Sequence, residues 1–381
     1  MNKLKVITIV GTRPELIRLS RVISRLDESL NHILVHTGQN YDYELNELFF
    51  DELKINKPKY YLDVDTSSLG KVLGNTLISI EKVLIKEKPD AVLILGDTNS
   101  SLAAIMAKRL HIPIYHMEAG NRSFDLNVPE EINRRIVDHI ADFNLVYTEH
   151  SRRHLLSEGL SHRHIYLTGS PMYEVLNFYS DMIDNSSILD KLKLKKKKYF
   201  TVSMHREENV DNKIILKNII SILNELTIKF NVPIIFSCHP RTKKMIKKLD
   251  KIEISKKIKF LKPFGFFDYI KLQKNSICVI SDSGTISEES AILNFPAITP
   301  RNSMERPEAL DSGSIILSGF DKENVMNSID ITINQYKTNK INKVIPKEYL
   351  IPDTSLRTLN LIVGTAKLSN IWAGINNKNK V

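Results

Sequence analysis

The chain has 381 residues, of which 42% are hydrophobic and 26% are charged. These proportions are typical of globular proteins and exclude a fibrous or largely disordered chain. The length exceeds what one ordinary core can hold, so two domains of about 150–200 residues are expected.

The formal net charge is +10, and much of the excess lies in lysine-rich runs at residues 191–198 and 243–257. These runs contain no interleaved aromatic side chains, so we interpret them as solvated surface rather than as a nucleic-acid groove. The positive surplus still favours an anionic substrate that carries phosphate.

Cys238 and Cys278 are far apart, and each lies in an apolar, strand-like run. We interpret both as reduced, which indicates a reducing compartment. The first apolar run is short and lacks a cleavage-site pattern, and no run is long enough to span a bilayer. We therefore expect a soluble cytoplasmic protein that has neither a membrane nor a nucleic acid as its partner.

Strand-like and helical patterns alternate from the first residues onward, which predicts βα units and a parallel sheet. The first strand, predicted over residues 4–10, ends at Gly11. Gly11 allows a ligand to approach the backbone, and Pro14 opens the helix that follows. Arg13 and Arg18 can then bind an anion at that helix N-terminus. Because the loop has neither GxGxxG nor Walker spacing, it indicates a dinucleotide site only weakly.

Two later strands of this half end in acidic residues. The strand predicted over residues 91–95 runs into Asp97, and the strand over 113–117 runs into Glu118. Ligands of open α/β sheets bind at the carboxyl ends of the strands, so both acids are candidates for a substrate site. Asp97 could instead simply cap a helix predicted over residues 98–110.

Pro129 begins a further predicted helix and is followed at once by Glu130 and Glu131. On the simplest interpretation these acids only complement the helix dipole, and Arg134 and Arg135 are solvated. The acids at the neighbouring strand ends favour a functional site instead.

A domain boundary is predicted near residues 169–171, where a Gly-Ser-Pro turn interrupts the pattern. A second βα series begins at Tyr199. Its first strand ends at His205, beside an arginine, which is suitable for a phosphate ligand or an acid.

The sequence SDSGT at residues 281–285 lies between a predicted strand and a helix. Its N–H groups and hydroxyls suit a diphosphate, and Glu289, one turn into the helix, suits a ribose diol. An ordinary capped helix with surface acids is the alternative. The aromatic residues at 264–269 are interpreted as core rather than as a platform for a base.

Two similar βα halves predict an α/β fold of two Rossmann-like domains that face each other across a cleft. The N-terminal domain is assigned to residues 1–169 together with a C-terminal helix at about 355–375. The C-terminal domain is assigned to residues 170–354.

Eight short motifs occur in order over most of the chain. They are GTRPE at Gly11, HTGQNYD at His36, GDTNS at Gly96, HMEAGNR at His116, PEEINR at Pro129, HREEN at His205, SDSGT at Ser281 and ERPE at Glu305. Together they resemble the non-hydrolysing UDP-N-acetylglucosamine 2-epimerase family. The resemblance implies the GT-B architecture, in which a UDP-sugar lies between two Rossmann-like domains. It also implies an isomerase, commonly a homodimer, that requires no nicotinamide or other cofactor. No metal is expected either, since no cluster of His and Cys ligands is apparent.

Longer phrases are most similar to the branch that forms UDP-N-acetyl-L-fucosamine from UDP-2-acetamido-2,6-dideoxy-L-talose. This reaction belongs to the synthesis of bacterial surface polysaccharides such as capsule, O-antigen and lipopolysaccharide. The phrases are HTGQNYDYELNELFF, GNRSFDLNVPEEINRRIVDH, KPFGFFDY and SDSGTISEES. A 2-epimerase of UDP-N-acetyl-L-rhamnosamine, or of the UDP-N-acetylglucosamine/UDP-N-acetylmannosamine pair, remains open. So do a GT-B glycosyltransferase, a hydrolysing epimerase and a UDP-sugar sensor without activity.

The resemblance assigns roles to individual residues of this sequence. The catalytic positions match Asp97, Glu118, Glu130 and His205. The substrate-binding positions match Arg13, Arg18, Phe264, Tyr269, Ser283, Gly284, Thr285, Glu289 and Arg306.

Some positions depart from the family pattern. Arg18 stands where lysine is usual, which keeps the charge but changes the hydrogen-bond geometry. Thr285 replaces a second glycine, and Phe264 replaces a more polar residue, so only a backbone contact is plausible there. Asn121 and Ser123 depart from the usual GLRT, consistent with a different sugar.

The mechanism implied by the family begins with elimination, because no carbonyl activates the C2 proton. UDP leaves to form a glycal and then adds again after the proton returns to the opposite face. Carboxylates would stabilise the oxocarbenium character, as they do in glycosidases. Arg13, His205 and the N–H groups of residues 283–285 would hold the diphosphate. The three carboxylates would share the roles of base, acid and electrostatic stabiliser, with no acid assigned to a particular face.

Overall fold

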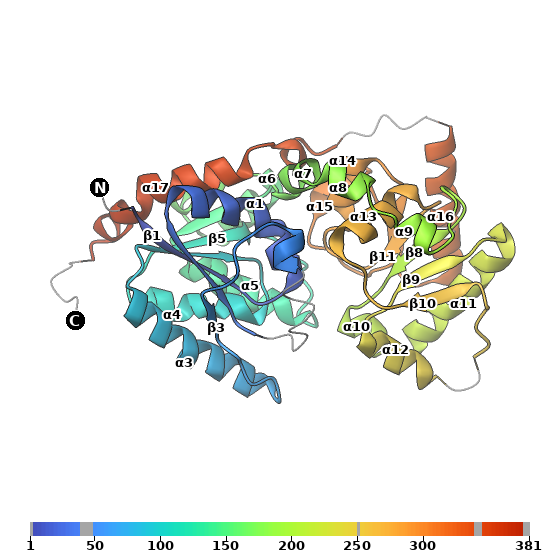
Figure 1. Ribbon diagram of the computed structural model, residues 1–381, viewed down its shortest axis with the longest axis horizontal. Coiled ribbons are helices and arrows are strands. Elements are labelled where there is room, and N and C mark those ends of the chain that lie inside the picture. Colours follow the sequence, from blue (N-terminus) through green and yellow to red (C-terminus); the bar gives the residue numbers. More distant parts are fainter. Residues whose placement is uncertain (1–2, 39–48, 250–251, 339–344, 376–381) are drawn as a thin grey trace. The chain divides into compact units, whose positions relative to one another are not determined.

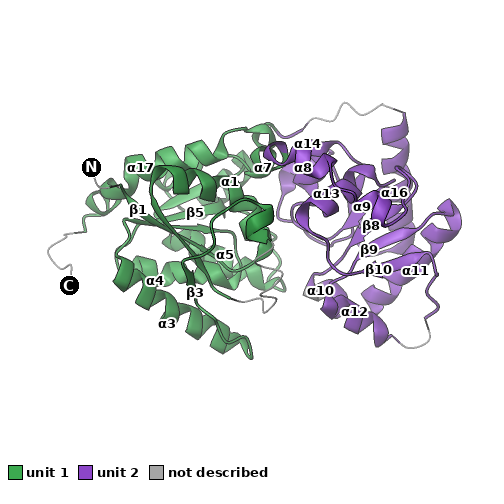
Figure 2. Cartoon of the chain, in the orientation of Figure 1, with its two compact units in different colours: residues 1–176, 347–381 green, residues 177–346 purple. Residues whose placement is uncertain are grey.

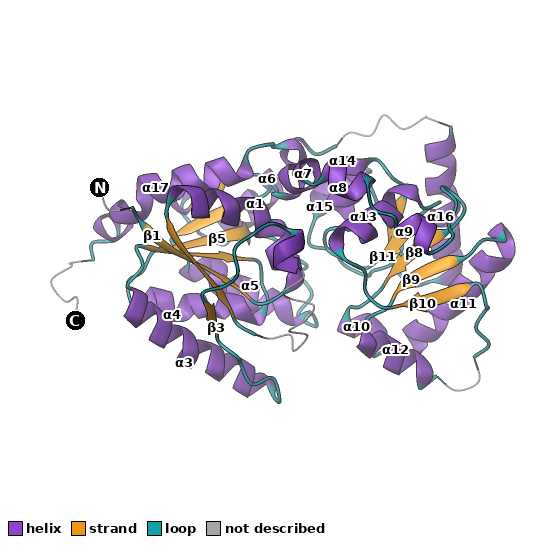
Figure 3. Cartoon of the chain, in the orientation of Figure 1, coloured by secondary structure: helices purple, strands orange, loops and turns teal. Residues whose placement is uncertain are grey.

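The computed structural model describes residues 3–38, 49–249, 252–338 and 345–375. The chain forms two compact units (Figure 2). Unit 1 comprises residues 1–176 and 347–381, and unit 2 comprises residues 177–346. In each unit, helices surround a central sheet (Figure 3). No helix within the described residues is both long and apolar enough to cross a membrane.

The sheet of unit 1 has seven strands in the order β3-β2-β1-β4-β5-β6-β7. The strands are β1 (Lys5–Val10), β2 (Asn31–His36), β3 (Tyr60–Tyr61), β4 (Ala91–Leu95), β5 (Ile114–Ala119), β6 (Phe143–Val146) and β7 (Ile165–Leu167). All pair in parallel. The central strands are nearly continuous apolar runs because helices cover both faces of the sheet.

Helices pack on both faces of this sheet. Those outside the second unit are α1 (Arg13–Ser29), α3 (Leu69–Glu87), α4 (Ala104–Arg109), α5 (Pro129–Ile140), α6 (Glu149–Ser157) and α17 (Thr354–Trp372), with the short α7 (Met172–Phe178) at the boundary. Figure 1 shows α3, α4 and α5 on one face and α1, α6 and α17 on the other. The segment predicted as a helix over residues 98–110 begins instead as a 3₁₀ turn, η1 (Asn99–Ala103), and continues as α4.

The sheet of unit 2 has six parallel strands in the order β10-β9-β8-β11-β12-β13. They are β8 (Phe200–Ser203), β9 (Ile234–Ser237), β10 (Ile258–Leu261), β11 (Val279–Ser281), β12 (Ala297–Thr299) and β13 (Ile316–Leu317). Its helices include α10 (Glu207–Val210), α11 (Lys213–Phe230), α12 (Pro240–Lys247), α13 (Phe266–Asn275), α14 (Ile286–Leu293), α15 (Pro307–Asp311) and α16 (Lys322–Lys337). The predicted pair of Rossmann-like domains with parallel sheets, the GT-B class, is therefore confirmed.

The end of the chain completes unit 1, because α17 packs against α1. Thr354 donates to the backbone oxygen of Thr168 at 3.2 Å, and the Ser355 N–H donates to Glu174 at 2.9 Å. The division between the units falls at residues 176/177 and 346/347, compared with the expected 169/170 and 354/355.

Each sheet has one point at which the strand order reverses. In unit 1 the reversal lies between β1 and β4, and in unit 2 between β8 and β11. Open α/β sheets bind ligands outside the carboxyl ends of the strands at such a point. The fold therefore identifies the loops after β1, β4, β8 and β11 as the places for functional residues.

Both cysteines, Cys238 and Cys278, are buried and free of disulfides, as predicted. Burial raises the pKa of the Cys238 thiol to about 11. A thiol that stays protonated is a weak nucleophile, so Cys238 acts as a small apolar core residue.

Candidate active site

Glu15 joins the loops after β1 and β4 in unit 1. Its buried carboxylate accepts hydrogen bonds from the Gly11 N–H at 2.5 Å and from the Thr12 N–H at 3.0 Å. It also accepts from the Thr98 hydroxyl at 2.5 Å and from the Ser100 hydroxyl at 3.1 Å. Burial raises the pKa of Glu15, although these donors oppose the rise. The two loops of the switch point are thereby fixed to each other. In the sequence, Glu15 is recognisable only as the last residue of the GTRPE motif.

The two predicted arginines lie at the start of α1. Arg13 is its first residue, and its guanidinium carbon lies 4.7 Å from the ring centroid of Phe49. Arg18, one turn further, donates to the carboxylate of Glu118 and, through Nε, to the backbone oxygen of Pro14 at 3.2 Å. This ion pair brings together two residues that are 100 positions apart in the sequence.

Glu118 lies at the end of β5 in a left-handed backbone conformation, with φ of 66°. The register of β5 against β6 shifts between Met117 and Ala119, so the strand is irregular where Glu118 leaves it. Its side chain is 10% exposed, and Asn121 donates to it at 3.4 Å. A left-handed conformation at a non-glycine residue is uncommon and costs energy, and such strain gathers at functional sites.

Gly96 lies directly beneath this carboxylate. A Cβ atom at Gly96, where φ is 72°, would lie 3.1 Å from Oε2 of Glu118. The glycine therefore leaves room for the carboxylate to approach the loop after β4, which carries Asp97.

Asp97 follows β4, and its side chain is 19% exposed. Its carboxylate accepts from Arg134 of α5, and its backbone oxygen accepts from Asn133 at 3.0 Å. Thr98, rather than Asp97, is the N-cap residue of η1. The interpretation of Asp97 as a simple helix cap is therefore wrong.

The two glutamates at the start of α5 differ in their surroundings. Glu130 is exposed, whereas Glu131 is completely buried. Glu131 accepts from the N–H of Ser123 at 2.9 Å, from Arg134 at 2.7 Å and from Arg135 at 3.1 Å. Glu131 therefore does more than complement a helix dipole. Arg134, with a side chain only 5% exposed, is not solvated as the simplest interpretation had it.

A second buried network of hydrogen bonds and ion pairs includes His116 of β5. His116 is fully buried; its Nε2 lies 2.8 Å from the backbone oxygen of Gly96, and its Nδ1 lies 2.9 Å from the carboxylate of Asp138. Arg122 contacts the same carboxylate at 2.6 Å. Burial alone would raise the pKa of Asp138, but His116 and Arg122 hold it below its ordinary value. The network fixes the backbone that carries Asp97 and Glu118. No local sequence pattern indicates that Asp138 is buried.

The switch point of unit 2 is organised around Asp282, which directly follows β11. Its buried carboxylate accepts from the N–H groups of His205 and Arg206, each at 3.1 Å, and from Asn209 at 3.0 Å. It lies 3.2 Å from Nδ1 of His205, whose side chain is 51% exposed. Burial would raise the pKa of Asp282, but the charge and hydrogen bonds of His205 and the other donors lower it to about 2. Asp282 thus fixes the predicted histidine at the sheet edge.

The SDSGT loop and α14 place the remaining predicted residues of unit 2. The Ser283 and Thr285 hydroxyls lie 3.1 Å apart. Glu289 accepts from Thr285 at 2.7 Å and from Gln273 at 2.8 Å. The structure therefore groups these residues, with a buried Glu289 facing the loop rather than the outer surface.

Arg306 lies beside the same loop and is buried. Its Nε donates to the backbone oxygen of Gly284 at 2.9 Å, and its Nη2 lies 3.1 Å from Glu288. Arg206 also contributes, donating to the backbone oxygen of Asp282 at 2.9 Å. Two guanidinium groups thus accompany the loop that is predicted to bind a diphosphate.

Of the predicted aromatic residues, Tyr269 lies on α13 and Phe264 lies just before this helix. Phe264 is partly buried against a cluster that includes Tyr199 and Leu272, which agrees with a structural role for its ring. Burial and the charge of Glu289 raise the pKa of Tyr269. Its phenol therefore stays protonated and can act as a hydrogen-bond donor.

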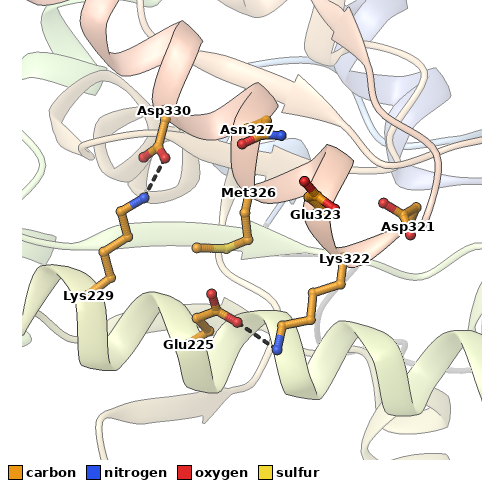
Figure 4. A pocket seen from close by; sticks show the side chains of 8 residues that line it. All are labelled: Glu225, Lys229, Asp321, Lys322, Glu323, Met326, Asn327 and Asp330. Atoms are coloured by element: carbon orange, nitrogen blue, oxygen red, sulfur yellow. Dashed lines mark hydrogen bonds and ion pairs between the residues drawn. The ribbon is translucent and has the colours of Figure 1, made fainter.

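A surface pocket of about 490 Å³ lies elsewhere in unit 2, between α11 and α16. Figure 4 shows that charged side chains line it and that ion pairs join Lys229 to Asp330 and Lys322 to Glu225. None of the predicted site residues lines this pocket.

The described part of the chain therefore holds two residue groups, one in each unit. In unit 1, Asp97 and Glu118 are each held by an arginine, and their carboxylates suit proton transfer and stabilisation of positive charge. In unit 2, a histidine, two arginines and a hydroxyl-rich loop suit an anion. Residues 39–42 of the HTGQNYD motif lie outside the described residues. The individual roles of the residues stay predictions.

Comparison with known proteins identifies relatives of the whole chain. A sequence profile described as UDP-N-acetylglucosamine 2-epimerase matches residues 24–363. A UDP-N-acetylglucosamine 2-epimerase of Methanocaldococcus jannaschii is 40% identical over 88% of this chain and 94% of its own. A UDP-2,3-diacetamido-2,3-dideoxy-D-glucuronate 2-epimerase of Pseudomonas aeruginosa is 34% identical over 85% of this chain and 91% of its own.

Two solved structures are similar over nearly their full length. A UDP-N-acetylglucosamine 2-epimerase from Rickettsia bellii is 47% identical, with a TM-score of 0.90 over 98% of this chain and 100% of that one. The Methanocaldococcus jannaschii enzyme, in complex with UDP-GlcNAc and UDP, is 37% identical, with a TM-score of 0.88 over 95% of this chain and 100% of that one.

Proposed function

The chain belongs to the UDP-N-acetylglucosamine 2-epimerase family, and on that basis we propose how its residues invert C2 of a UDP-bound 2-acetamido sugar. The protein is a non-hydrolysing isomerase that acts on UDP-sugars. One observation carries the proposal. Asp97 follows β4, which borders the switch point of unit 1, and Glu118 lies at the end of the adjacent strand β5; each carboxylate contacts an arginine.

The proposed reaction starts with the departure of UDP. Removal of the C2 proton and breakage of the bond between C1 and the phosphate oxygen give a glycal. UDP then adds again to C1 while a proton reaches C2 from the opposite face. Inversion therefore needs acid–base groups on two faces, which a pair of separate carboxylates supplies.

Unit 2 would bind the nucleotide and stabilise the leaving group. The SDSGT loop offers N–H groups and hydroxyls, and His205, Arg206 and Arg306 offer positive charge. A diphosphate that carries more negative charge after bond breakage gains most from such donors, so they favour the departure of UDP. Glu289, in hydrogen-bond contact with Thr285, remains our candidate for the ribose hydroxyls.

Unit 1 would carry out the chemistry at C2. Glu130 is exposed at the start of α5 and is the third proposed acid. Arg13 and Arg18, at the amino end of α1, add charge that would attract the substrate diphosphate. We leave open which carboxylate serves which face of the sugar.

We propose UDP-2-acetamido-2,6-dideoxy-L-talose as the substrate and UDP-N-acetyl-L-fucosamine as the product. The loop after β5 supports this choice, since Phe124 and Leu126 are 69% and 72% exposed. Their apolar surface, just before Glu130, suits a C6 methyl group better than a hydroxymethyl group. The names of the similar enzymes support UDP-N-acetylglucosamine as the second candidate.

The test is incubation with single UDP-sugars in heavy water, followed by proton NMR. The panel contains UDP-N-acetylglucosamine, the 6-deoxy-L-talo sugar and UDP-N-acetyl-L-rhamnosamine. The expected result is an inverted C2 that carries deuterium, formed fastest from the 6-deoxy-L-talo sugar without an acceptor. Fastest turnover of UDP-N-acetylglucosamine would refute the 6-deoxy substrate. Free sugar with UDP, or no solvent exchange with any member, would refute the epimerisation itself.

We also propose that the protein is a homodimer. Four isoleucines on the outer faces of α3 and α5 support an interface there, since Ile78, Ile85, Ile132 and Ile136 are all at least 38% exposed. Light scattering in solution measures the mass directly, and a monomer would contradict the proposal.

A further inference from the structure

We propose that Arg134 is a positioning residue, which holds the Asp97 carboxylate in place for proton transfer at C2. The inference rests on the proposed function, because it takes Asp97 as one of the reacting acids. Arg134 itself is placed too deeply to be expected to contact the sugar, with a side chain 5% exposed.

The guanidinium group of Arg134 contacts two carboxylates. Nη2 of Arg134 donates to Asp97, and Nη1 donates to Glu131 at 2.7 Å. Among the described residues, Arg134 is the only group that donates to the Asp97 carboxylate. A planar guanidinium can hold two carboxylates at a set angle, which a flexible ammonium holds less well.

Arg134 is held in place by Glu131. Glu131 is completely buried, and besides Arg134 it accepts from the N–H of Ser123 at 2.9 Å and its hydroxyl at 3.1 Å. Because Glu131 is fixed in this way, Arg134 has little freedom to move. Arg134 in turn restricts the position of the Asp97 carboxylate.

Helix α5 also contacts the backbone of Asp97. Asn133, the neighbour of Arg134 on α5, donates to the backbone oxygen of Asp97 at 3.0 Å and to Asn99 at 3.1 Å. Helix α5 therefore fixes both the main chain and the side chain of the acid. A displacement of a reacting group by about 1 Å can cost about a hundredfold in rate, so this support bears on catalysis.

The test compares Arg134→Lys and Arg134→Gln with the matched control Arg135→Gln. Arg135 also pairs with Glu131 but is 41% exposed and makes no contact with Asp97. For the UDP-sugar that the wild-type protein turns over best, kcat and KM are measured from deuterium incorporation at C2, and calorimetry gives the affinity for UDP. We expect kcat to fall about a hundredfold in Arg134→Gln and about tenfold in Arg134→Lys, with KM and UDP affinity within about threefold of wild type.

The control variant is expected to keep kcat within about twofold, as an exposed ion pair contributes little. If Arg134→Gln does not fold, because Glu131 loses a donor, Arg134→Lys decides the matter, since it retains the charge. Wild-type kcat in Arg134→Lys or Arg134→Gln, or an equal loss in Arg135→Gln, would overturn the inference. Absence of exchange in the wild-type protein is a different failure, which would remove the proposed function and this inference with it.

Discussion

We predict that His36 makes unit 1 less stable in mild acid. The residue ends β2, its ring is 1% exposed, and its Nδ1 accepts the Gly38 N–H at 3.0 Å. Burial lowers the pKa of His36 from 6.5 to about 4, although the charge of Asp63 opposes the shift. A neutral ring is also required by the hydrogen bond, since a protonated Nδ1 cannot accept.

The sign and size of the effect follow from linkage. The pKa of His36 is lower in the folded state, so the unfolded chain binds the proton more readily. The stability that His36 contributes is therefore complete above pH 6.5 and is lost as the pH falls towards about 4. At about 1.4 kcal/mol per pKa unit, the full loss is about 3 kcal/mol, of which about 2 kcal/mol is lost by about pH 5.

The assay is urea unfolding of wild type and His36→Asn at about pH 7.5 and about pH 5. Asparagine keeps an acceptor near the position of Nδ1 but does not titrate. The single tryptophan, Trp372, lies on α17 in unit 1, so its fluorescence follows the unit that contains His36. The variant loses packing at both pH values, and the readout is the change between them.

We expect the free energy of unfolding to fall by about 2 kcal/mol more in wild type than in His36→Asn between these pH values. Replacement of the exposed His162 by glutamine is the control and should leave the wild-type pH dependence intact. An equal pH dependence in wild type and His36→Asn would refute the argument that burial keeps this ring neutral.

Three further variants test the two residue groups. Glu118→Gln should abolish deuterium incorporation at C2 while UDP affinity, measured by calorimetry, changes less than about threefold, because the nucleotide is assigned to unit 2; undiminished exchange would exclude Glu118 from the mechanism. Asp282→Asn should weaken UDP binding by about tenfold or more, because His205 loses its charged partner; unchanged affinity would contradict the role of this pair. Gly96→Ala should lower kcat more than UDP affinity and cost about 1–2 kcal/mol in urea unfolding, because alanine would be strained at φ of 72° and would crowd Glu118; wild-type kcat would show that the carboxylate has room to move.

Much of the fold follows from local pattern. The strands β1, β4 and β5 were predicted within a few residues, because parallel strands buried on both faces are short apolar runs. The edge strands β3 and β13 were missed. Each has only two residues, and so few positions carry no detectable pattern.

Residues of the candidate site were predictable where a reactive side chain comes at the end of a strand. Asp97 and Glu118 could be found because an acid after an apolar run falls at the carboxyl edge of a sheet. Their partners could not be found in the same way. Arg18 pairs with Glu118 across 100 residues, and Arg134 pairs with Asp97 across 37. Local sequence patterns do not show contacts at such separations.

Burial was the other missing quantity. Glu131 has the same side chain as its neighbour Glu130, yet one is enclosed and the other is exposed. Asp282 likewise had no predicted role of its own within SDSGT, although its carboxylate accepts hydrogen bonds from the loop after β8. In both cases the acid is buried because donors from other segments surround it, and those donors are identified only by the tertiary structure.

Because α17 follows unit 2 in the sequence, unit 1 can be completed only after unit 2 has been synthesised. Tyr115 of β5 donates or accepts a hydrogen bond at 2.6 Å with Thr365, and Ile362 and Ala366 are buried on the same helix. These contacts form only after residues 354–372 have emerged from the ribosome. The continuous segment 177–346 can therefore fold first, while the part of unit 1 that is made earlier keeps apolar surface uncovered. Loss of α17 would leave a chain in which unit 2 is complete and unit 1, which carries Asp97 and Glu118, is not.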